Sequence, residues 1–451
     1  AKHQTVPCQS RRGGAKRAPA KDRILKTVKL GIAGLGHVGC GLIELVERQA
    51  DLRLPGKVEI VGVSARSKNR NRPVDISGYR WFDDAATLAE DPDIDVFVEL
   101  VGGSDGPAKV AVEAAMNAGK HVVTANKALI AMHGQSLETQ AQEKDVDLMF
   151  EAAVAGGVPI VRVLRDSLTG VAIQRVSGIL NGTCNYLTTQ MLETGRSYGD
   201  VLDEAQRLGY AEADPTLDVS GMDAAHKAAI LASIAFTADL DFSKVSVKGV
   251  DTVELVDLVL ADRLGLRIKL ITEGLLTADG VVCRVAPLAL PVDHPLARVD
   301  GALNTVRVEG DPLGAVTLTG PGAGPGPTAS AVMGDIAKLF TPTARSPFGR
   351  APHHGTRSFV EAKPAERSAF FFRVKLADRP GALASLTEAL AAHSVSVDKL
   401  LQESADDSDV SPVAIVTHMC SRGDIEGASA RVSNLEASVG APQVIAIDAV
   451  K

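Results

Sequence analysis

The chain has 451 residues, of which 45% are hydrophobic and 23% charged, and its formal net charge is -7. This length exceeds what one hydrophobic core usually holds, so we expect two or three domains of a globular protein. The acidic balance gives no reason to expect nucleic acid or an anionic membrane as a partner, and no apolar run reaches the roughly 18 residues of a membrane span.

Residues 1–26 differ from the rest because they are rich in Lys and Arg, carry Gly and Pro, and show no apolar period. We predict a disordered basic tail without the apolar segment of a secretory signal. The cysteines are odd in number and none has CxxC spacing, which favours neither a disulfide framework nor a zinc site and suggests the cytoplasm. They are Cys8, Cys40, Cys184, Cys283 and Cys420.

Between residues 27 and 151, short apolar runs alternate with helical patterns. This alternation predicts a parallel, doubly wound α/β sheet with right-handed crossovers, the Rossmann arrangement. The expected strands are 28–33, 57–63, 94–101, 121–124 and 147–151, with helices at 37–50 and 108–118.

The pattern changes from residue 152 onward. Residues 152–325 predict a mixed α/β domain, helical between 186 and 237 and strand-rich between 245 and 308. A helix at 326–340 is assigned back to the first domain, and the proline-bearing segment 341–367 is expected to be a linker. Residues 368–451 show β-α-β-β-α-β order, the ferredoxin-like motif.

A glycine motif follows the first predicted strand and opens a helix: Gly34, Gly36 and Gly39, with His37 and Val38 between the last two. Such a turn lets a dinucleotide pyrophosphate approach the backbone at a helix N-terminus. A purely structural strand-to-helix turn is the alternative.

The second predicted strand ends without the acid that would grip a ribose 2′-hydroxyl. Arg66 and Lys68 follow instead, and a guanidinium suits a 2′-phosphate. This favours NADP, with NAD as the alternative cofactor and solvated loop cations as the alternative reading.

Lys127 follows the fourth predicted strand, at the edge where open α/β sheets bind ligands, although an ordinary surface lysine would also fit there. Further along, Asp223 and Lys227 stand at i and i+4 on a stripe that continues through Ile230 and Ile234. The charged pair therefore continues an apolar face.

Three more acids precede this pair: Glu212, Asp214 and Asp218. Asp223 could merely be the acid of a capping box, or form an ordinary helix pair with Lys227. Four acids converging on one semi-buried lysine instead favour a ligand site. An amino-acid substrate needs an acid for its ammonium group, and a lysine whose pKa is lowered by burial could move the proton of an alcohol.

At this point the chain resembles the homoserine dehydrogenase family. The matching segments run in order from about residue 28 to 340: GLGHVG, TANKALIA, FEAAVAGGVPI, SGILNGTCNY, LGYAEADPTLDVSGMDAAHKAAILA and GPGAGPGPTASAV. The resemblance implies NAD(P)-dependent interconversion of homoserine and aspartate semialdehyde, in threonine, methionine and isoleucine biosynthesis. Residues 368–451, which carry the segment from Asp378 to Leu383, look like an ACT domain.

The resemblance also implies residue roles. Lys227 would transfer the hydroxyl proton, Glu212 and Asp223 would contact homoserine, and Asp218 would face the site. Lys127 would lie between cofactor and substrate. Further cofactor contacts would come from Gly103, Gly209 and Gly324, and a monovalent cation, usually sodium, would be held by Glu151 and the carbonyls of Val154, Gly156 and Val158.

Two positions depart from the family: Cys184 stands where Ser or Thr is usual, and Pro325 follows Gly324. Beyond the substrate, we expect a regulatory amino acid, threonine first, and a homo-oligomer, dimer or tetramer. Three alternatives stay open: another Rossmann-type dehydrogenase for sugars or diaminopimelate, an amino-acid sensor with a vestigial enzyme, and an ACT domain that only supports assembly.

Overall fold

The computed structural model describes residues 26–211, 214–340, 346–349, 356–362, 367–403 and 409–448. The predicted basic tail up to residue 25, Cys8 and Glu212 therefore lie outside the described residues, as does most of the 341–367 segment. Within the described part of the chain, no helix is long and apolar enough to cross a bilayer.

The first domain is built on a parallel sheet of strand order β3-β2-β1-β4-β5-β6, the order of a doubly wound dinucleotide-binding fold. Its strands are β1 (Thr27–Ala33), β2 (Lys57–Ser64), β3 (Arg80–Phe82), β4 (Val96–Glu99), β5 (His121–Thr124) and β6 (Leu148–Met149). The Rossmann prediction is confirmed. The pattern had not indicated β3, α2 (Ala85–Glu90) or α4 (Lys127–Lys144).

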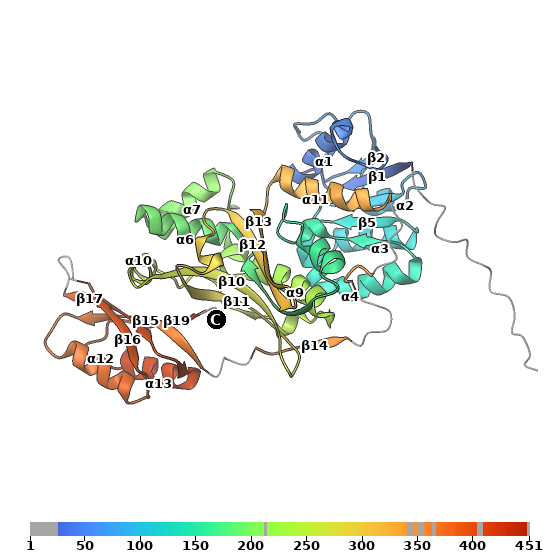
Figure 1. The fold of residues 1–451 in the computed structure, drawn as a ribbon. Helices are drawn as coiled ribbons and strands as arrows, with labels where there is room; N and C mark the ends of the chain where they lie inside the picture. The colour runs from blue at the N-terminus through green and yellow to red at the C-terminus, as the bar shows by residue number, and fades with distance from the viewer. Residues whose placement is uncertain are drawn as a thin grey trace, which may run out of the picture.

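Two helical layers cover this sheet because its strands are apolar on both faces. Helices α2, α3 (Pro107–Asn117) and α4 pack with Phe97 on one face, and α1 (His37–Glu47) packs with Val96 and Val98 on the other. Helix α11 (Pro325–Lys338) returns from far along the chain to lie beside α1 (Figure 1). It begins at Pro325, earlier than predicted, because proline suits the first position of a helix.

The second domain has an antiparallel sheet ordered β13-β12-β7-β10-β11. Its elements are β7 (Ala172–Ile179), α6 (Gly182–Thr194), α7 (Tyr198–Arg207), α9 (Met222–Phe236), α10 (Leu255–Arg263), β10 (Leu266–Leu276), β11 (Val281–Pro291), β12 (Leu303–Asp311) and β13 (Gly314–Pro321). Short helices and strands complete it: α5 (Ile160–Arg162), α8 (Thr216–Val219), β8 (Ala238–Asp239) and β9 (Ser246–Val247).

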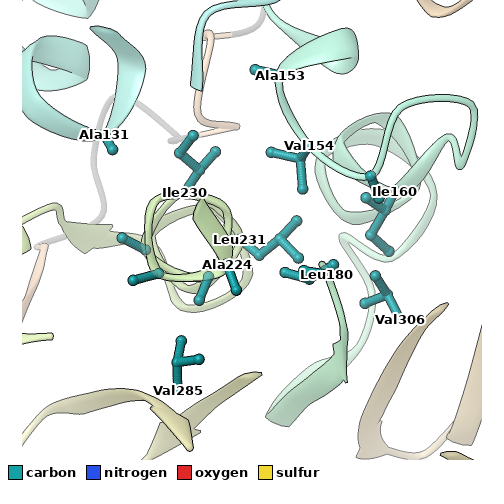
Figure 2. Close-up of a cluster of buried hydrophobic side chains, with 14 of the residues drawn as sticks. Ala131, Ala153, Val154, Ile160, Leu180, Ala224, Ile230, Leu231, Val285 and Val306 are labelled. Carbon is teal, nitrogen blue, oxygen red and sulfur yellow. The ribbon is translucent and has the colours of Figure 1, made fainter. Parts of the chain in front are cut away.

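Helix α9 is the core helix of this domain. Figure 2 shows its Ala224, Ile230 and Leu231 surrounded by side chains from several elements, with Leu180 beside Leu231 and Val285 below the helix. Apart from a few partly exposed positions, α9 is buried on all sides. The predicted single apolar stripe was therefore too narrow.

The C-terminal unit has the predicted β-α-β-β-α-β order. Its elements are β15 (Arg367–Ala377), α12 (Ala382–Ala391), β16 (Val397–Gln402), β17 (Val410–Thr417), the short β18 (Cys420–Ser421), α13 (Arg422–Ser433) and β19 (Gln443–Ile447). It is not merely tethered by a linker, because β19 pairs with β11 at Ile447 and Ala289, joining the two sheets. Within the predicted linker, β14 (Arg357–Val360) also pairs with β11 and β8.

Candidate active site

The glycine turn after β1 has the geometry that a dinucleotide needs. Gly34 has φ +98°, and a Cβ there would meet the carbonyl oxygen of Leu100 at 2.4 Å. A Cβ on Gly39 would lie 2.1 Å from the carbonyl oxygen of Gly34, so the helix packs too closely on the turn for any other residue. No described atom lies within 4 Å of a Cβ on Gly36, the N-cap of α1. The backbone at Gly36 is thus open to an approaching anion.

Exposed cations gather in the loop after β2. Arg66 and Lys68 are exposed, and Arg72 donates to the carbonyls of Lys68 and Arg70, both at 3.0 Å. Burial raises the pKa of the Cys40 thiol in α1, and the positive charges of Arg72 and Arg70 oppose that rise, so the loop lies near the start of α1. Ser64 ends β2 where an acid would bind a 2′-hydroxyl.

A buried network fixes the turn after β4. Glu99 is fully buried and accepts from the amides of Val101 at 2.7 Å and Gly102 at 3.0 Å, and from Thr124 Oγ1 at 2.5 Å. Asn126 donates to the carbonyl of Gly103 at 2.7 Å and caps α4. Lys127 is the first residue of that helix, so this network sets where its side chain starts.

Lys127 and Lys227 meet on one buried carboxylate. Lys127 Nζ lies 2.6 Å from Asp223 Oδ1, and Lys227 Nζ lies 2.8 Å from Asp223 Oδ2. Lys227 also donates to the carbonyl of Leu180 at 2.8 Å. Lys127 comes from the dinucleotide-binding domain and Asp223 from α9 of the second, so the site forms where the two domains touch. Asp223 does not cap its helix, whose N-cap is Gly221.

Asn181 organises the acids of the site, although the sequence had not singled it out. Its Nδ2 donates to Asp218 Oδ1 and to Asp223 Oδ2, both at 2.8 Å, while its Oδ1 caps α6 by accepting from Cys184 N. Asparagine is a preferred N-cap residue, which was the one available sequence signal. The same side chain therefore begins α6 and spaces two carboxylates.

The charges of the site are strongly coupled. Burial alone would raise the pKa of Asp223, but the charges of Lys227 and Lys127 and their hydrogen bonds lower it overall. Burial lowers the pKa of Lys227, and Asp223 opposes this only in part. Burial and the charge of Asp223 raise the pKa of Asp218. A lysine whose pKa is lowered accepts and gives a proton at a lower pH than an ordinary lysine does.

The four predicted acids do not all converge. Asp214 is exposed and accepts from Thr216 N at 3.1 Å and Thr216 Oγ1 at 2.6 Å, just before α8, so its inclusion was wrong. Glu212 lies outside the described residues. Gly209, with φ +77°, reverses the chain after α7 and leads into the loop toward Asp218.

The two departures from the family pattern are accommodated locally. Cys184 is fully buried and its thiol donates to the carbonyl of Asp218 at 3.3 Å, a contact that a hydroxyl would also make. Pro325 occupies the first turn of α11, directly after Gly324, whose φ is +115°. Neither residue disrupts the turn that carries it.

The segment predicted to hold a cation contains a sharp bend. Glu151 is 2% exposed, and its carboxylate accepts from the amides of Val161 at 2.9 Å and Arg162 at 2.8 Å. Burial and nearby Asp335 raise the pKa of Glu151 to about 7. Ala155 and Gly156 both have positive φ, which turns the chain between Val154 and Val158. Carbonyl and carboxylate oxygens are a donor set that suits a hard cation.

Comparisons with known proteins agree with this architecture. Family models described as homoserine dehydrogenase, its NAD-binding domain and the ACT domain match residues 159–337, 34–151 and 371–437. The homoserine dehydrogenase of Pseudomonas aeruginosa is 40% identical over 92% of this chain and 98% of its own. That of Synechocystis is 40% identical over 93% and 99%.

Solved structures give the same picture. A homoserine dehydrogenase from Thiobacillus denitrificans aligns with a TM-score of 0.84 and 36% identity over 94% of this chain and 98% of that one. A hyperthermophilic archaeal homoserine dehydrogenase in complex with NADPH aligns with a TM-score of 0.61 and 27% identity, covering 71% of this chain and 100% of its own.

Proposed function

The chain belongs to the homoserine dehydrogenase family, and from that premise we propose how its own residues carry out the interconversion of homoserine and aspartate semialdehyde. The observation that carries the proposal is the meeting of Lys127 and Lys227 on Asp223, between the dinucleotide turn and the substrate domain. When bound, the nicotinamide supplies the hydride for the aldehyde carbon or accepts it from the alcohol carbon.

Lys227 is the proton donor and acceptor in this proposal. In reduction its ammonium protonates the oxygen of the new alkoxide, and in oxidation its neutral amine removes the hydroxyl proton. Asp223 and the carbonyl of Leu180 hold Nζ in place from two sides. Lys127, with 43% of its side chain exposed, faces the cofactor side of the same carboxylate and can polarise the reacting oxygen.

Asp218 and Glu212 are proposed to bind the substrate ammonium group. Asp218, in α8, is held by Asn181. Glu212 follows Ala211 in the sequence and lies outside the described residues. Holding the substrate between these acids and Lys227 contributes to the rate by fixing the reacting atoms in place. Gly34, Gly36, His37, Val38, Gly39, Gly103, Gly209 and Gly324 are the proposed backbone contacts for the cofactor.

NADP is the proposed cofactor because the loop after β2 carries cations and no acid. Replacing Arg66 with Ala should raise the KM for NADPH by roughly tenfold or more, since a hydrogen bond to a charged group is lost, and should change the KM for NADH little. Steady-state reduction of aspartate semialdehyde with NADPH and with NADH measures the two KM values. Arg53→Ala, an exposed cation before β2, is the control for lost charge alone. Equal effects of Arg66→Ala on both cofactors would remove Arg66 from the 2′-phosphate site.

Glu151 and the carbonyls of Val154, Gly156 and Val158 are proposed to hold a monovalent cation, sodium by family resemblance. The bend at Ala155 and Gly156 and the oxygen-only donor set support this. The bend also contacts the turn that carries Gly324: Gly157 N donates to Pro321 O at 3.1 Å. The cation would stabilise this junction.

The C-terminal domain is proposed to bind an amino acid, threonine before isoleucine. Gly381, with φ +89°, opens α12, where backbone amides could receive a ligand carboxylate. Strands β13 and β16 lie at the edges of the sheet and could pair with another copy of the chain, which supports a homodimer or tetramer. A cytoplasmic location also remains a prediction.

Added threonine should inhibit the full chain, with a coupling of about 1–3 kcal/mol, or about 5–150-fold in apparent affinity. Gly381→Asp should weaken this inhibition because a carboxylate would stand where the ligand's own carboxylate binds. Gly381→Asn is the matched control, since both residues tolerate positive φ and only one is charged. A full chain that is active but indifferent to threonine and isoleucine would make the domain structural.

A further inference from the structure

Asn304 is a buried residue whose side-chain amide shares a hydrogen-bond acceptor with Lys227. It lies near the start of β12, beside the end of β7, and only 1% of it is exposed. Its Nδ2 donates to the carbonyl of Leu180 at 3.2 Å, the same carbonyl that accepts from Lys227 at 2.8 Å. One carbonyl therefore joins Asn304 to Lys227.

The amide oxygen of Asn304 has no hydrogen-bond partner among the described residues, although it is buried. The amide cannot be turned round to relieve this, because its oxygen would then face the Leu180 carbonyl. Leaving a buried acceptor unpaired costs free energy. The hydrogen bond from Nδ2 to the Leu180 carbonyl is what favours this orientation of the amide.

The Asn304 amide also packs closely against Gly322, in the Gly/Pro turn before α11. A Cβ on Gly322 would stand 2.1–2.3 Å from the Cγ, Oδ1 and Nδ2 atoms of Asn304. Gly322 has an ordinary φ, so the requirement for glycine comes from Asn304 and not from the backbone. The turn in question carries Gly324, one of the proposed cofactor contacts.

We propose that Asn304 is a positioning residue: it fixes the Leu180 carbonyl against Lys227 and, through Gly322, sets the distance between Lys227 and the cofactor turn. The inference rests on the proposed role of Lys227 as proton donor and acceptor. One side chain would thus fix the position of Lys227 Nζ relative to the backbone of the Gly324 turn.

Removing the amide has a defined effect on Lys227. In Asn304→Ala the Leu180 carbonyl is left wholly to the lysine, and water can enter the space that the amide filled. Both changes favour the charged form of Lys227, so its pKa rises. In homoserine oxidation, where the neutral amine is needed, the acid limb of the kcat/KM profile should move to higher pH by roughly half a unit or more. Turnover should fall by roughly 10–100-fold through misplacement.

Gly322→Ala tests the same contact from the other side. Its Cβ would displace the Asn304 amide, so it should reproduce the shift of the acid limb in the otherwise unaltered chain. In an Asn304→Ala background the three clashing atoms are gone, so the second substitution should add little. This non-additivity is specific to the proposed contact.

Thr305→Val is the matched control, because Thr305 is fully buried on the same strand but bonds Leu318 O and Thr319 Oγ1 of β13. It should leave the acid limb where it is, even if it lowers the melting temperature. If all three substitutions only lower the melting temperature, or if Gly322→Ala and Asn304→Ala are additive, the positioning role is refuted. If Asn304→Ala does not fold, an unshifted acid limb in Gly322→Ala refutes it. Lys227→Ala with near-normal turnover would instead refute the proposed function itself.

Discussion

Lys227→Ala should lower turnover by roughly two orders of magnitude or more while leaving NADPH binding nearly unchanged. The side chain is fixed by two contacts, to Asp223 Oδ2 and to the Leu180 carbonyl, and neither partner belongs to the glycine turn that is proposed to bind the pyrophosphate. Stopped-assay turnover and fluorescence titration of NADPH measure the two quantities separately.

One further variant separates charge from proton transfer. Lys227→Arg keeps a positive charge beside Asp223, but a guanidinium does not give up its proton in a protein, so turnover should stay low. Near-normal turnover in either Lys227→Ala or Lys227→Arg would show that another group moves the proton. Asp223 is unsuitable for that task, because the two lysines hold its pKa well below its usual range.

The pH dependence has a definite sign. Burial lowers the pKa of Lys227, against the opposing charge of Asp223, and the charge of Lys127 adds to the lowering. In the proposed mechanism homoserine oxidation requires the neutral amine of Lys227, so its rate should rise with pH through the pKa of Lys227. That rise should occur below the usual pKa range of a lysine. Reduction requires the ammonium form and should fall over the same interval.

The parts of the site that the sequence predicted are formed by residues close together in the chain. The glycine turn follows one strand and opens one helix, and Asp223 and Lys227 are one helical turn apart, so both could be read from spacing. Asn181 and Asn304 could not, because they act across 42 and 124 residues of chain, on Asp223 and on the Leu180 carbonyl. Contacts with a backbone carbonyl leave no side-chain pattern.

The predictions that were wrong or incomplete have similar causes. Asp214 belongs to the acid-rich segment by composition, but its own neighbour Thr216 satisfies it. Strand β3 has only three residues, too few for an alternation to show. The segment 341–367 was expected to be a linker because of its prolines, yet β14 within it pairs with β8, more than a hundred residues earlier in the chain.

The other large expected effect concerns the attachment of the C-terminal domain. Arg373 of β15 is 4% exposed and Asp257 of α10 is fully buried. Arg373 Nε lies 2.6 Å from Asp257 Oδ1, and Nη2 lies 3.0 Å from both Asp257 Oδ2 and Glu254 Oε1. Asp257 Oδ2 also accepts from Glu254 N, which caps α10. The domains are thus joined by a buried, bidentate ion pair.

Arg373→Met should lower the free energy of unfolding by about 3–5 kcal/mol, because it leaves the Asp257 carboxylate buried without its partner. Adding Asp257→Asn should recover much of that loss, since asparagine removes the charge and keeps an oxygen for the cap. Denaturant titration followed by circular dichroism measures both variants. Arg379→Met, which breaks the exposed pair with Glu436, is the control and should leave the transition nearly unchanged. Equal stability of Arg373→Met and the double variant would show that the pair is not what joins the domains.

The same pair offers a route for the proposed threonine signal. Helix α10 contacts α6, and Asn181 at the start of α6 holds Asp218 and Asp223. A shift of β15 on ligand binding would therefore reach the site through α10 and α6, without the 341–367 segment. The double variant Arg373→Met/Asp257→Asn, folded but lacking the charged contact, should keep its turnover and lose most of its response to threonine. If it responds as the unaltered chain does, the signal passes instead through β14 or through the junction of β19 with β11.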